Sequence, residues 1–504
     1  MARGILLTGA TGFLGRYLLR DLLVHGRSVG LLIRGNAEQS AFERLDELHD
    51  FACESSSRTL PRPVLLEGDL RTPNLGLDAA ERSWLAREVD AVVHSAAYVA
   101  YQPTSDGEPW ETNVNGTYRL LELCRSLGIT ELHHLSTAFV CGDRRGTVHE
   151  NELDLGDGTG NAYEQSKFAA EQLIHDCSGM RTTIYRPSIV VGDSATGYTS
   201  TYHHFYRFLE LAVRLSGQGG KNRTRRQNLS IRLPLTGEEV QNIVPVDWVS
   251  QALLAILSQP RRHGSTYHLV ASRSLRLREI CAILGDLLGF EGVSCVGSEG
   301  LPDATALESL VLDQFKEYWS YLRANVIFDR RNLLSALPDL PPPAFDAAYV
   351  SRLLAFAQRD GWGRDRTRPT QRDEAAGLGH YLEHILPMRM RNSPLAEALP
   401  DGLIFVLDVR GPGGGQWSYR CADGSLRVWR GRAADASVAY RMEVPALADV
   451  LQRRQTAQQA FFDGRIDIEG DAEKAMKLAL LIEQFLAQDN QVSPQDTEMI
   501  HAAG

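Results

Sequence analysis

The chain has 504 residues, of which 43% are hydrophobic and 23% charged, a globular composition with enough length for two or three domains. A formal net charge of −10 excludes a general nucleic-acid binder, which needs a dominant basic face. No apolar run reaches the roughly 18 residues of a membrane span, and the seven cysteines lack the paired spacing of a zinc or disulfide framework. We therefore expect a cytoplasmic protein with no transmembrane segment, no nucleic-acid partner and no metal.

From residue 4 to about residue 192, short apolar runs alternate with longer amphipathic stretches. This alternation predicts an α/β fold, a doubly wound parallel Rossmann sheet. The expected buried strands are Gly4–Thr8, Ser28–Ile33, Val64–Glu67, Ala91–His94, Glu131–Ser136 and Thr182–Arg186. The first domain is predicted to span residues 1–360, with 1–192 mainly binding the cofactor and 193–360 mainly covering the substrate.

Residues 361–377 are rich in Arg, Asp, Gly and Pro and are predicted to form a linker. After them the pattern changes to period-two strands between residues 403 and 442, a further strand at Arg465–Glu469 and a final helix from Ala472. We therefore expect a separate small α+β domain at residues 378–488, followed by a tail at 489–504.

The run TGATGFLG, residues 8–15, follows the first strand and opens a helix. Gly9 permits a tight turn, Gly12 lets the backbone approach a pyrophosphate, and Gly15 allows close packing of helix and strand. Thr11, Phe13 and Leu14 belong to the same turn. The spacing predicts a dinucleotide site, although a turn of this kind also occurs without a ligand.

The residue after the second strand selects between the two nicotinamide cofactors. An acid that would bind a ribose hydroxyl is missing there, and Arg34 stands in its place. A guanidinium suits a 2′-phosphate, which an acid would repel. The sequence therefore predicts NADP(H).

Tyr163 and Lys167 are four residues apart and share one face of a predicted helix. Reduction of a carbonyl by hydride leaves an alkoxide that needs a proton, and an ammonium beside a tyrosine lowers the phenol pKa. Thr137 follows the strand at Glu131–Ser136, at the sheet edge where ligands bind, and can polarise the substrate carbonyl. These three residues are the predicted catalytic group, with Ser136 as a weaker candidate than Thr137.

Residues 1 to about 360 resemble the extended short-chain dehydrogenase/reductases. Within this superfamily they are most similar to thioester reductase and fatty acyl-CoA reductase domains. The segments that carry the likeness are TGATGFLGRYL at 8–18, VLLEGDLRTPNLGL at 64–77, DAVVHSAA at 90–97, NVNGT at 113–117, residues 136–140 and residues 163–167. The resemblance implies Thr137, Tyr163 and Lys167 as catalytic residues and Asn113 as a residue that orders the site, with a loop or capping role for Asn113 left open. It further implies cofactor contacts from Tyr163 and Lys167 themselves and from Asp69, Leu70, Ser95, Ala96, Ala97, Pro187 and Ile189.

Residues 378–488 resemble the sterol carrier protein type 2 fold, on Trp417, Asp435 and above all the run FFDGRIDIEG at 461–470. The likeness implies an apolar cavity for a lipid ligand. Side chains that could line it are Phe461, Phe462, Met476, Leu480 and Phe485. A filled core or an oligomerisation module remains the alternative.

Together these features predict an NADPH-dependent oxidoreductase that transfers hydride to a carbonyl or acyl-thioester carbon of a hydrophobic substrate. A thioester, an aldehyde and a ketone all remain open. Two other readings also stay open: a lipid-binding or transfer protein with the Rossmann domain as a scaffold, and an epimerase or dehydratase with a tightly bound cofactor.

Overall fold

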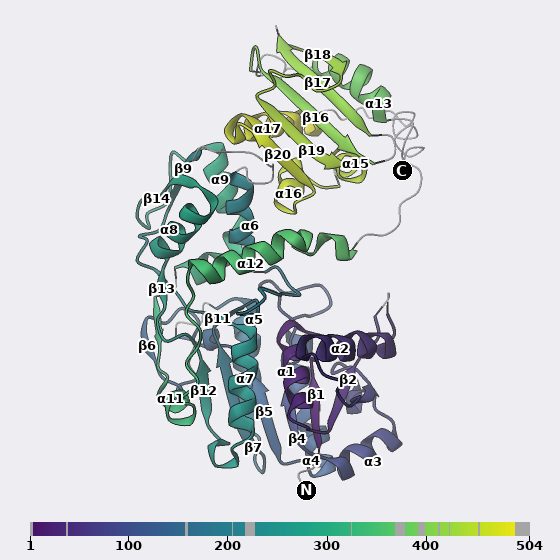
Figure 1. Cartoon of the computed structure of the whole chain (residues 1–504), viewed down its shortest axis with the longest axis vertical. Coiled ribbons are helices and arrows are strands. Elements are labelled where there is room, and N and C mark those ends of the chain that lie inside the picture. The colour runs from purple at the N-terminus through teal and green to yellow at the C-terminus, as the bar shows by residue number, and fades with distance from the viewer. Residues whose placement is uncertain are drawn as a thin grey trace. The chain divides into compact units, whose positions relative to one another are not determined.

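The computed structural model describes residues 4–36, 39–156, 160–203, 205–216, 227–323, 325–367, 378–391, 398, 400–411, 414–422, 424–451 and 454–488. Part of the expected linker, residues 368–377, and the expected tail at 489–504 lie outside this set. The chain packs into two compact units, of which the first comprises residues 1–205, 237–283 and 317–365 and the second residues 206–236, 284–316 and 366–504. Figure 1 labels the elements of both units.

The first unit is built on a seven-stranded sheet whose strands are all parallel, in the order β12-β7-β5-β4-β1-β2-β3. The strands are β1 (Gly4–Thr8), β2 (Val29–Ile33), β3 (Val64–Glu67), β4 (Val89–His94), β5 (Glu131–Leu135), β7 (Arg181–Pro187) and β12 (Thr266–Leu269). Six of them match the strands expected from the sequence. The seventh, β12, is only four residues long with a histidine in it, so its pairing with β7 carries no periodic signal.

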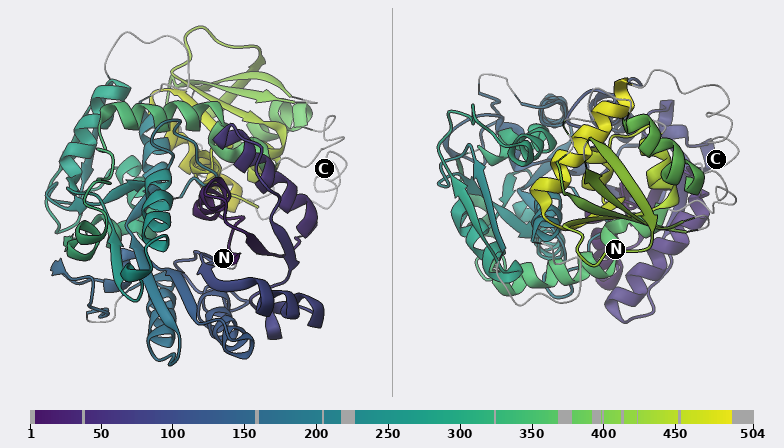
Figure 2. Two further views of the ribbon diagram at one scale, coloured as in Figure 1. Left: turned by 60° about the horizontal axis from the view of Figure 1, so that its bottom comes forward. Right: turned by 90° about the horizontal axis from the view of Figure 1, so that it is seen from above.

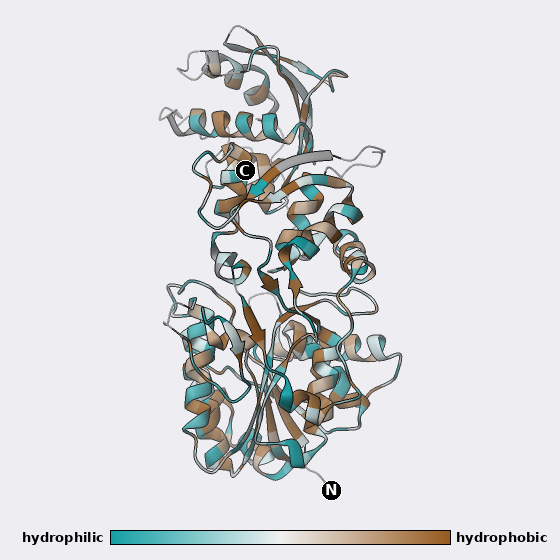
Figure 3. Ribbon diagram, turned by 90° about the vertical axis from the view of Figure 1, so that its left-hand side faces the viewer, coloured by the Kyte–Doolittle hydropathy of each residue, from teal (hydrophilic) through white to brown (hydrophobic). Residues whose placement is uncertain are grey.

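Helices cover both faces of this sheet, as a doubly wound fold requires. One face packs on α1 (Phe13–Val24), α2 (Ala41–Ser56) and α7 (Val246–Leu257), and the other on α3 (Ala79–Glu88), α4 (Gly116–Leu127) and α5 (Ala162–His175). Apolar side chains of the helices and strands form a separate core cluster on each face. Figure 3 shows the strands largely brown between helices that carry teal residues on their outer turns.

The remaining elements of the first unit are short segments around both edges of the sheet and two longer helices. They are η1 (Pro73–Gly76), η2 (Glu111–Asn115), η3 (Ala138–Cys141), β6 (Gly146–Val148), β8 (Ile189–Val191), β10 (Val240–Gln241), β11 (Ile243–Pro245), η4 (Pro260–Arg262), β13 (Leu275–Arg276), α8 (Leu277–Leu288), α10 (Trp319–Leu322), β15 (Val326–Phe328), α11 (Arg331–Ala336), α12 (Ala347–Arg359) and η6 (Gly361–Thr367). Among the described residues, none of the helices combines the length and the apolar character needed to cross a bilayer.

The second unit contains a five-stranded mixed sheet in the order β18-β17-β16-β19-β20. Its strands are β16 (Ile404–Arg410), β17 (Gly415–Ala422), β18 (Ser425–Arg430), β19 (Val438–Glu443) and β20 (Ile466–Gly470), and its helical segments are α13 (Leu378–His380), η7 (Tyr381–Ile385), α14 (Leu386–Arg391), α15 (Val444–Leu451), α16 (Ala457–Phe462) and α17 (Ala472–Gln488). Helix α17 packs on β19 and β20 (Figure 2). These elements agree closely with the α+β pattern expected for the C-terminal region.

Four elements from the middle of the chain pack in this second unit. They are α6 (Phe205–Leu215), β9 (Gln227–Leu233), β14 (Phe290–Cys295) and α9 (Ala306–Gln314). Arg214 of α6 lies against the Phe461 ring, with 5.4 Å from its guanidinium carbon to the ring centroid, and donates to the Ile466 carbonyl at 3.2 Å. A segment that the sequence analysis assigned to the substrate-covering part thus folds together with the C-terminal sheet.

Candidate active site

The glycine loop has the geometry that a pyrophosphate needs. Gly9 has a φ of +73°, and a Cβ at Gly15 would lie 2.0 Å from the Gly9 carbonyl oxygen, so neither position accepts a side chain without a backbone shift. Gly12 is different, because a Cβ there would meet only that same oxygen, at 3.3 Å. Gly12 caps α1 without any side-chain hydrogen bond, and the first turn of α1 carries no acid. The exposed start of α1 therefore presents free N–H groups and a positive dipole to an anion.

The remaining residues of this loop lie beside it as expected. Thr11, Phe13 and Leu14 are half-buried around the start of α1. Opposite them, Ser95 donates its backbone N–H to the Thr8 carbonyl at 3.2 Å. A Cβ on Gly9 would lie 2.4 Å from the Ala96 nitrogen, so the glycine loop and the segment after β4 pack backbone to backbone. Residues 95–97 thus lie against the glycine loop at the carboxyl edge of the sheet, where Ala97 is exposed.

Arg34 and Asp69, which are both expected to contact the cofactor, form an ion pair. The Arg34 Nη1 lies 3.1 Å from the Asp69 Oδ2, and Arg71 binds the same carboxylate with its Nη2 at 2.8 Å. Both arginines hold the pKa of Asp69 at about 2 against the effect of burial. Arg44 of α2 donates to the Arg34 carbonyl at 2.7 Å. Two guanidinium groups therefore share the Asp69 carboxylate, a third lies against the Arg34 backbone, and Leu70 is buried.

Helix α5 places Tyr163 and Lys167 one turn apart. The helix starts where it does because Asn161 and Glu164 form a capping box, each satisfying the other's backbone N–H. The Lys167 side chain is 2% exposed, and its Nζ donates to the Leu135 carbonyl at 2.6 Å. Burial lowers the Lys167 pKa to about 8. Burial and the nearby Glu164 carboxyl raise the Tyr163 pKa to about 12, so the phenol is protonated at neutral pH.

Thr137 follows β5 directly and caps the short helix η3. Its Oγ1 accepts from the Phe139 N–H at 3.3 Å, and none of the described residues accepts its hydroxyl hydrogen. The neighbouring Ser136 Oγ is buried without a hydrogen-bond partner among the described residues. Leu135, which holds the Lys167 ammonium, is the last residue of β5. The end of β5 therefore supplies the carbonyl that fixes the lysine, and the hydroxyl proposed to meet the substrate follows two residues later.

Asn113 acts on the site through its neighbours. It is buried in the π-helical turn η2, a form that occurs mainly at functional sites. Its Nδ2 donates to the Ser166 Oγ at 2.9 Å, and its Oδ1 accepts from the Tyr98 N–H at 2.8 Å. Ser166 in turn donates to the Tyr163 carbonyl at 2.7 Å. Asn113 thus ties α5 to the segment after β4, and it contacts neither catalytic side chain in a hydrogen bond among those the structure describes.

The last expected cofactor residues, Pro187 and Ile189, lie where β7 ends and β8 begins. Pro187 is buried and Ile189 half-buried. Ser188 between them donates to the Asn242 Oδ1 at 2.7 Å, which fixes the turn. This turn stands next to β5 and β12 at the same edge as the other predicted residues.

The structure adds a buried histidine pair that the sequence analysis did not single out. His134 Nε2 lies 3.3 Å from the Lys167 Nζ, and its ring is 5.2 Å from that of His94. The Thr117 hydroxyl donates its one hydrogen to the Asn113 carbonyl, so His94 Nε2 must donate to the Thr117 oxygen. Burial lowers the pKa of His94 to about 3 and that of His134 far below its usual value. Two neutral imidazoles therefore line the floor beneath the lysine.

A second unforeseen group is a fully buried ion pair under α5. Arg186 of β7 binds Glu171 of α5 through two nitrogens, the shorter contact being 2.6 Å, and donates to the Glu152 carbonyl at 2.7 Å. The only sequence signal was a charged residue inside an apolar strand. The pair fixes α5, and with it Tyr163 and Lys167, against the sheet.

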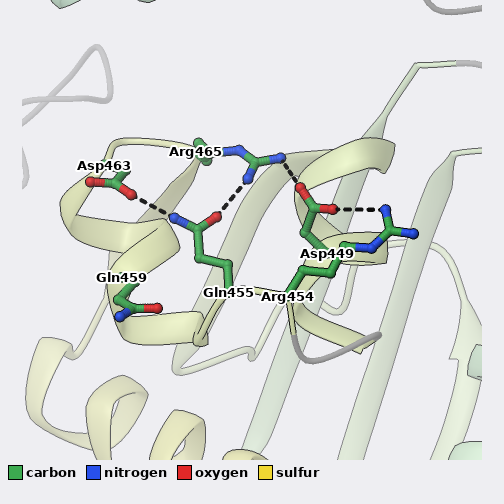
Figure 4. Close-up of a pocket in the computed structure, with 6 residues that line it drawn as sticks. All are labelled: Asp449, Arg454, Gln455, Gln459, Asp463 and Arg465. Carbon is green, nitrogen blue, oxygen red and sulfur yellow. Dashed lines mark hydrogen bonds and ion pairs between the residues drawn. The ribbon is translucent and has the colours of Figure 1, made fainter. Parts of the chain in front are cut away.

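In the C-terminal sheet domain, the side chains expected to line a lipid cavity are largely internal. Phe461, Phe462, Met476 and Phe485 are buried, and Leu480 is half-buried. The cavity in Figure 4 is instead an open hollow of about 750 Å³ whose lining is polar. Its lining residues are Asp449, Arg454, Gln455, Gln459, Asp463 and Arg465. This hollow suits a polar ligand, so a lipid site in the domain stays a prediction.

Two segments of the chain match known protein families. Residues 7–253 match the family described as male sterility protein, and residues 394–483 match the SCP-2 sterol transfer family. The chain is thus similar to the first family over its N-terminal half and to the second near its C-terminus. This confirms the resemblance to extended short-chain, thioester reductase-like dehydrogenases and to a sterol carrier protein drawn from the motifs.

The curated relatives are much longer than this chain. The nonribosomal peptide synthetase asaC of Aspergillus flavus is 31% identical over 283 residues, which are 53% of this chain and 26% of the relative. The L-2-aminoadipate reductase large subunit of Penicillium chrysogenum is 30% identical over 335 residues, 61% of this chain and 22% of the relative. The chain thus spans about a quarter of the length of these relatives.

Among solved structures, the terminal R domain of the myxalamid PKS-NRPS biosynthetic pathway aligns with a TM-score of 0.57 and 27% identity, over 72% of this chain and 92% of that one. The R domain of a nonribosomal peptide synthetase from Mycobacterium tuberculosis aligns with a TM-score of 0.52 at 19% identity, over 72% of this chain and 92% of that one, and shows the shared fold.

Proposed function

We propose that this chain is an NADPH-dependent reductase that delivers hydride to a carbonyl or acyl-thioester carbon of a hydrophobic substrate. The observation that carries the proposal is the placement of Lys167, which lies one turn from Tyr163 on α5 and whose buried ammonium donates to the Leu135 carbonyl, two residues before Thr137. A buried ammonium one helical turn from a protonated phenol can stabilise the phenolate that is left when the phenol gives up its proton, as a reducing site requires.

The residues present fit the cofactor. Gly9 and Gly15 close the loop so tightly that a side chain at either would collide with backbone, while Gly12 leaves its surface open. The start of α1 faces that opening and favours a pyrophosphate. When bound there, NADPH supplies the hydride.

The protein's own groups supply the remaining steps. Thr137 donates its hydroxyl hydrogen to the substrate carbonyl oxygen and polarises the carbon that accepts hydride. Tyr163 then gives its phenolic proton to the developing alkoxide, and the Lys167 ammonium stabilises the tyrosinate that this leaves. Asn113 is a positioning residue, because it reaches α5 only through Ser166.

The preference for NADPH over NADH rests on the arginines around Asp69. Arg34 and Arg71 bind the Asp69 carboxylate, and Arg44 donates to the Arg34 carbonyl, so the positive charges outnumber the negative one where a 2′-phosphate would lie. Arg34→Ala is expected to weaken NADPH binding and leave NADH binding nearly unchanged. Dissociation constants for both cofactors measure this, and an equal loss for the two would contradict the preference.

The hydrophobic character of the substrate rests on the second unit. A lipid-transfer family domain is fused to the reductase, and α6 of the predicted substrate-covering segment packs on it through Arg214 and Phe461. Each methylene buried by the substrate should contribute about 0.8 kcal/mol. We therefore expect kcat/KM to rise about threefold to fourfold per added methylene along a series of acyl-CoAs or aldehydes, up to the length of the site.

The decisive experiment follows NADPH oxidation by the full chain with acyl-CoAs, aldehydes and ketones of matched length. Tyr163→Phe should lower turnover by roughly two to four powers of ten. Tyr118→Phe is the matched control, because that phenol is exposed on α4 and bonds only Glu122 among the described residues. Turnover unaffected by Tyr163→Phe would refute the assignment.

The same experiment separates the other two functions. A protein that only carries lipid would oxidise no NADPH with any of the substrates while still binding lipid. An epimerase or dehydratase would purify with its nicotinamide bound and return it unchanged after each turnover. Either result would remove the proposed reductase.

A further inference from the structure

Three metal-ligating side chains meet at the edge of the main sheet opposite the candidate active site. Glu131 is the first residue of β5, His133 is two residues further on the same face of that strand, and His263 lies in the turn before β12. One ligand atom from each lies within 4.8 Å of the others. Lys167, by contrast, is held at the other end of β5. This cluster has no part in the proposed reduction.

The hydrogen bonds of His263 fix which of its nitrogens can bind a cation. Its Nε2 lies 3.2 Å from the Ile256 carbonyl and 3.1 Å from the Leu257 carbonyl. Because a carbonyl oxygen only accepts, Nε2 carries the ring hydrogen. Nδ1 then points its lone pair at the Glu131 Oε1, within hydrogen-bonding distance. Two acceptors meet in this way only when a cation, either a proton or a metal ion, lies between them.

His133 is held in a similar way. Its side chain is fully buried, and its Nδ1 lies 2.9 Å from the Tyr185 hydroxyl, which accepts as readily as it donates. Its Nε2 is buried without a hydrogen-bond partner among the described residues and lies 3.6 Å from the Glu131 Oε1, beyond hydrogen-bonding distance. An imidazole anchored through one nitrogen, with the other aimed at a shared carboxylate, is the arrangement of a metal ligand and its supporting group.

We propose that Glu131, His133 and His263 bind one divalent cation of the zinc class. Two imidazole nitrogens and one carboxylate oxygen are donors that zinc accepts at about 2.0–2.2 Å in tetrahedral geometry. Glu131 is 28% exposed and is the member that can rotate to admit the ion, and water from that side completes the coordination. The role is structural, because no substrate group of the proposed reaction reaches this edge.

The site would join two strands that do not pair. In the sheet, β7 separates β5 from β12. The turn before β12 crosses the start of β7, where Arg181 donates to the Pro260 carbonyl at 2.5 Å and the Gly264 N–H donates to the Thr183 Oγ1 at 3.0 Å. A metal bound between His263 and β5 would fasten this turn and hold the short edge strand β12 in register.

The test is a Zn²⁺ titration of the full chain after dialysis against a chelator, with a chromophoric chelator as competitor. The wild type should take up one equivalent, and Glu131→Gln and His263→Gln should each lose it. Tyr185→Phe removes only the group that orients His133 and should weaken binding about 10-fold to 100-fold. His49→Gln, a half-buried histidine bonded to the Leu60 carbonyl, is the matched control and should retain the full equivalent.

Two further measurements keep the result interpretable. The first is NADPH binding by each variant, which shows that the sheet has folded and is measured independently of zinc uptake. Anomalous diffraction at the zinc edge should place a peak between the three side chains. Equal uptake by the wild type and Glu131→Gln would overturn the proposal, because the zinc would then sit elsewhere, for example on cysteines. No uptake against the competitor would also overturn it and identify the cation as a proton in an imidazolium–carboxylate pair.

Discussion

The pH dependence of turnover offers a direct test of the role given to Lys167. Burial lowers its pKa from 10.5 to about 8, so the ammonium that stabilises the Tyr163 phenolate is lost within the measurable range. Tyr163 itself stays protonated across this range, because its pKa is raised to about 12. A fall in activity above about pH 8 should therefore reflect deprotonation of Lys167 and not of Tyr163.

The magnitude follows from the fraction of Lys167 that keeps its proton. With a pKa of about 8, that fraction is roughly nine-tenths at pH 7, one-tenth at pH 9 and one-hundredth at pH 10. The value of kcat/KM for NADPH should thus fall about tenfold from pH 7 to pH 9, and tenfold again by pH 10. This quantity is the suitable one, because kcat/KM reports the ionisations of the free enzyme.

The assay measures NADPH oxidation with decanal at saturation from pH 6 to pH 10. In Lys167→Arg the charge persists over the whole range, so the fall above about pH 8 should vanish even if the absolute rate is lower. Lys167→Met is the second control and should be slow and flat, since it has no charge at any pH. A fall that survives in either variant with the same midpoint would refute the reasoning.

Three further outcomes follow from the structure. Lys167→Met should raise the free energy of unfolding at pH 7 by up to about 3 kcal/mol, because the native state no longer holds a lysine whose pKa is depressed. The gain should shrink as the pH rises above 8 and disappear above about pH 11, where the wild-type lysine is neutral in both states; denaturant titration at pH 7 and pH 11 measures this. Glu171→Gln leaves Arg186 buried without its counter-charge and should cost about 3–5 kcal/mol by the same titration, whereas a loss below 1 kcal/mol would contradict the burial of the pair. Gly15→Ala should destabilise the fold, since its Cβ would lie 2.0 Å from a backbone oxygen, while Gly12→Ala should leave the melting temperature near that of the wild type and weaken only NADPH binding.

The sequence by itself determined the features that depend on local order. The six strands expected in the first sheet and the C-terminal sheet follow from apolar runs and apolar periodicity, which a strand carries within its own residues. The glycine loop and the Tyr163–Lys167 pair are local in the same sense, because a turn and a helix fix their geometry over a few residues. These elements were predicted close to their observed boundaries, and the sheet and the family kinship are confirmed.

The tertiary structure decided what depends on neighbours far apart in the chain. Strand β12 has the sequence TYHL, which contains no apolar run, and it forms a strand through its pairing with β7. The low pKa of Lys167 arises from its burial among elements far apart in the chain. The residues next to it in sequence do not indicate that burial. The cluster of Glu131, His133 and His263 joins residues more than 100 positions apart. Burial and charge pairing are properties of the folded environment, so they became visible only when the sheet brought these side chains together.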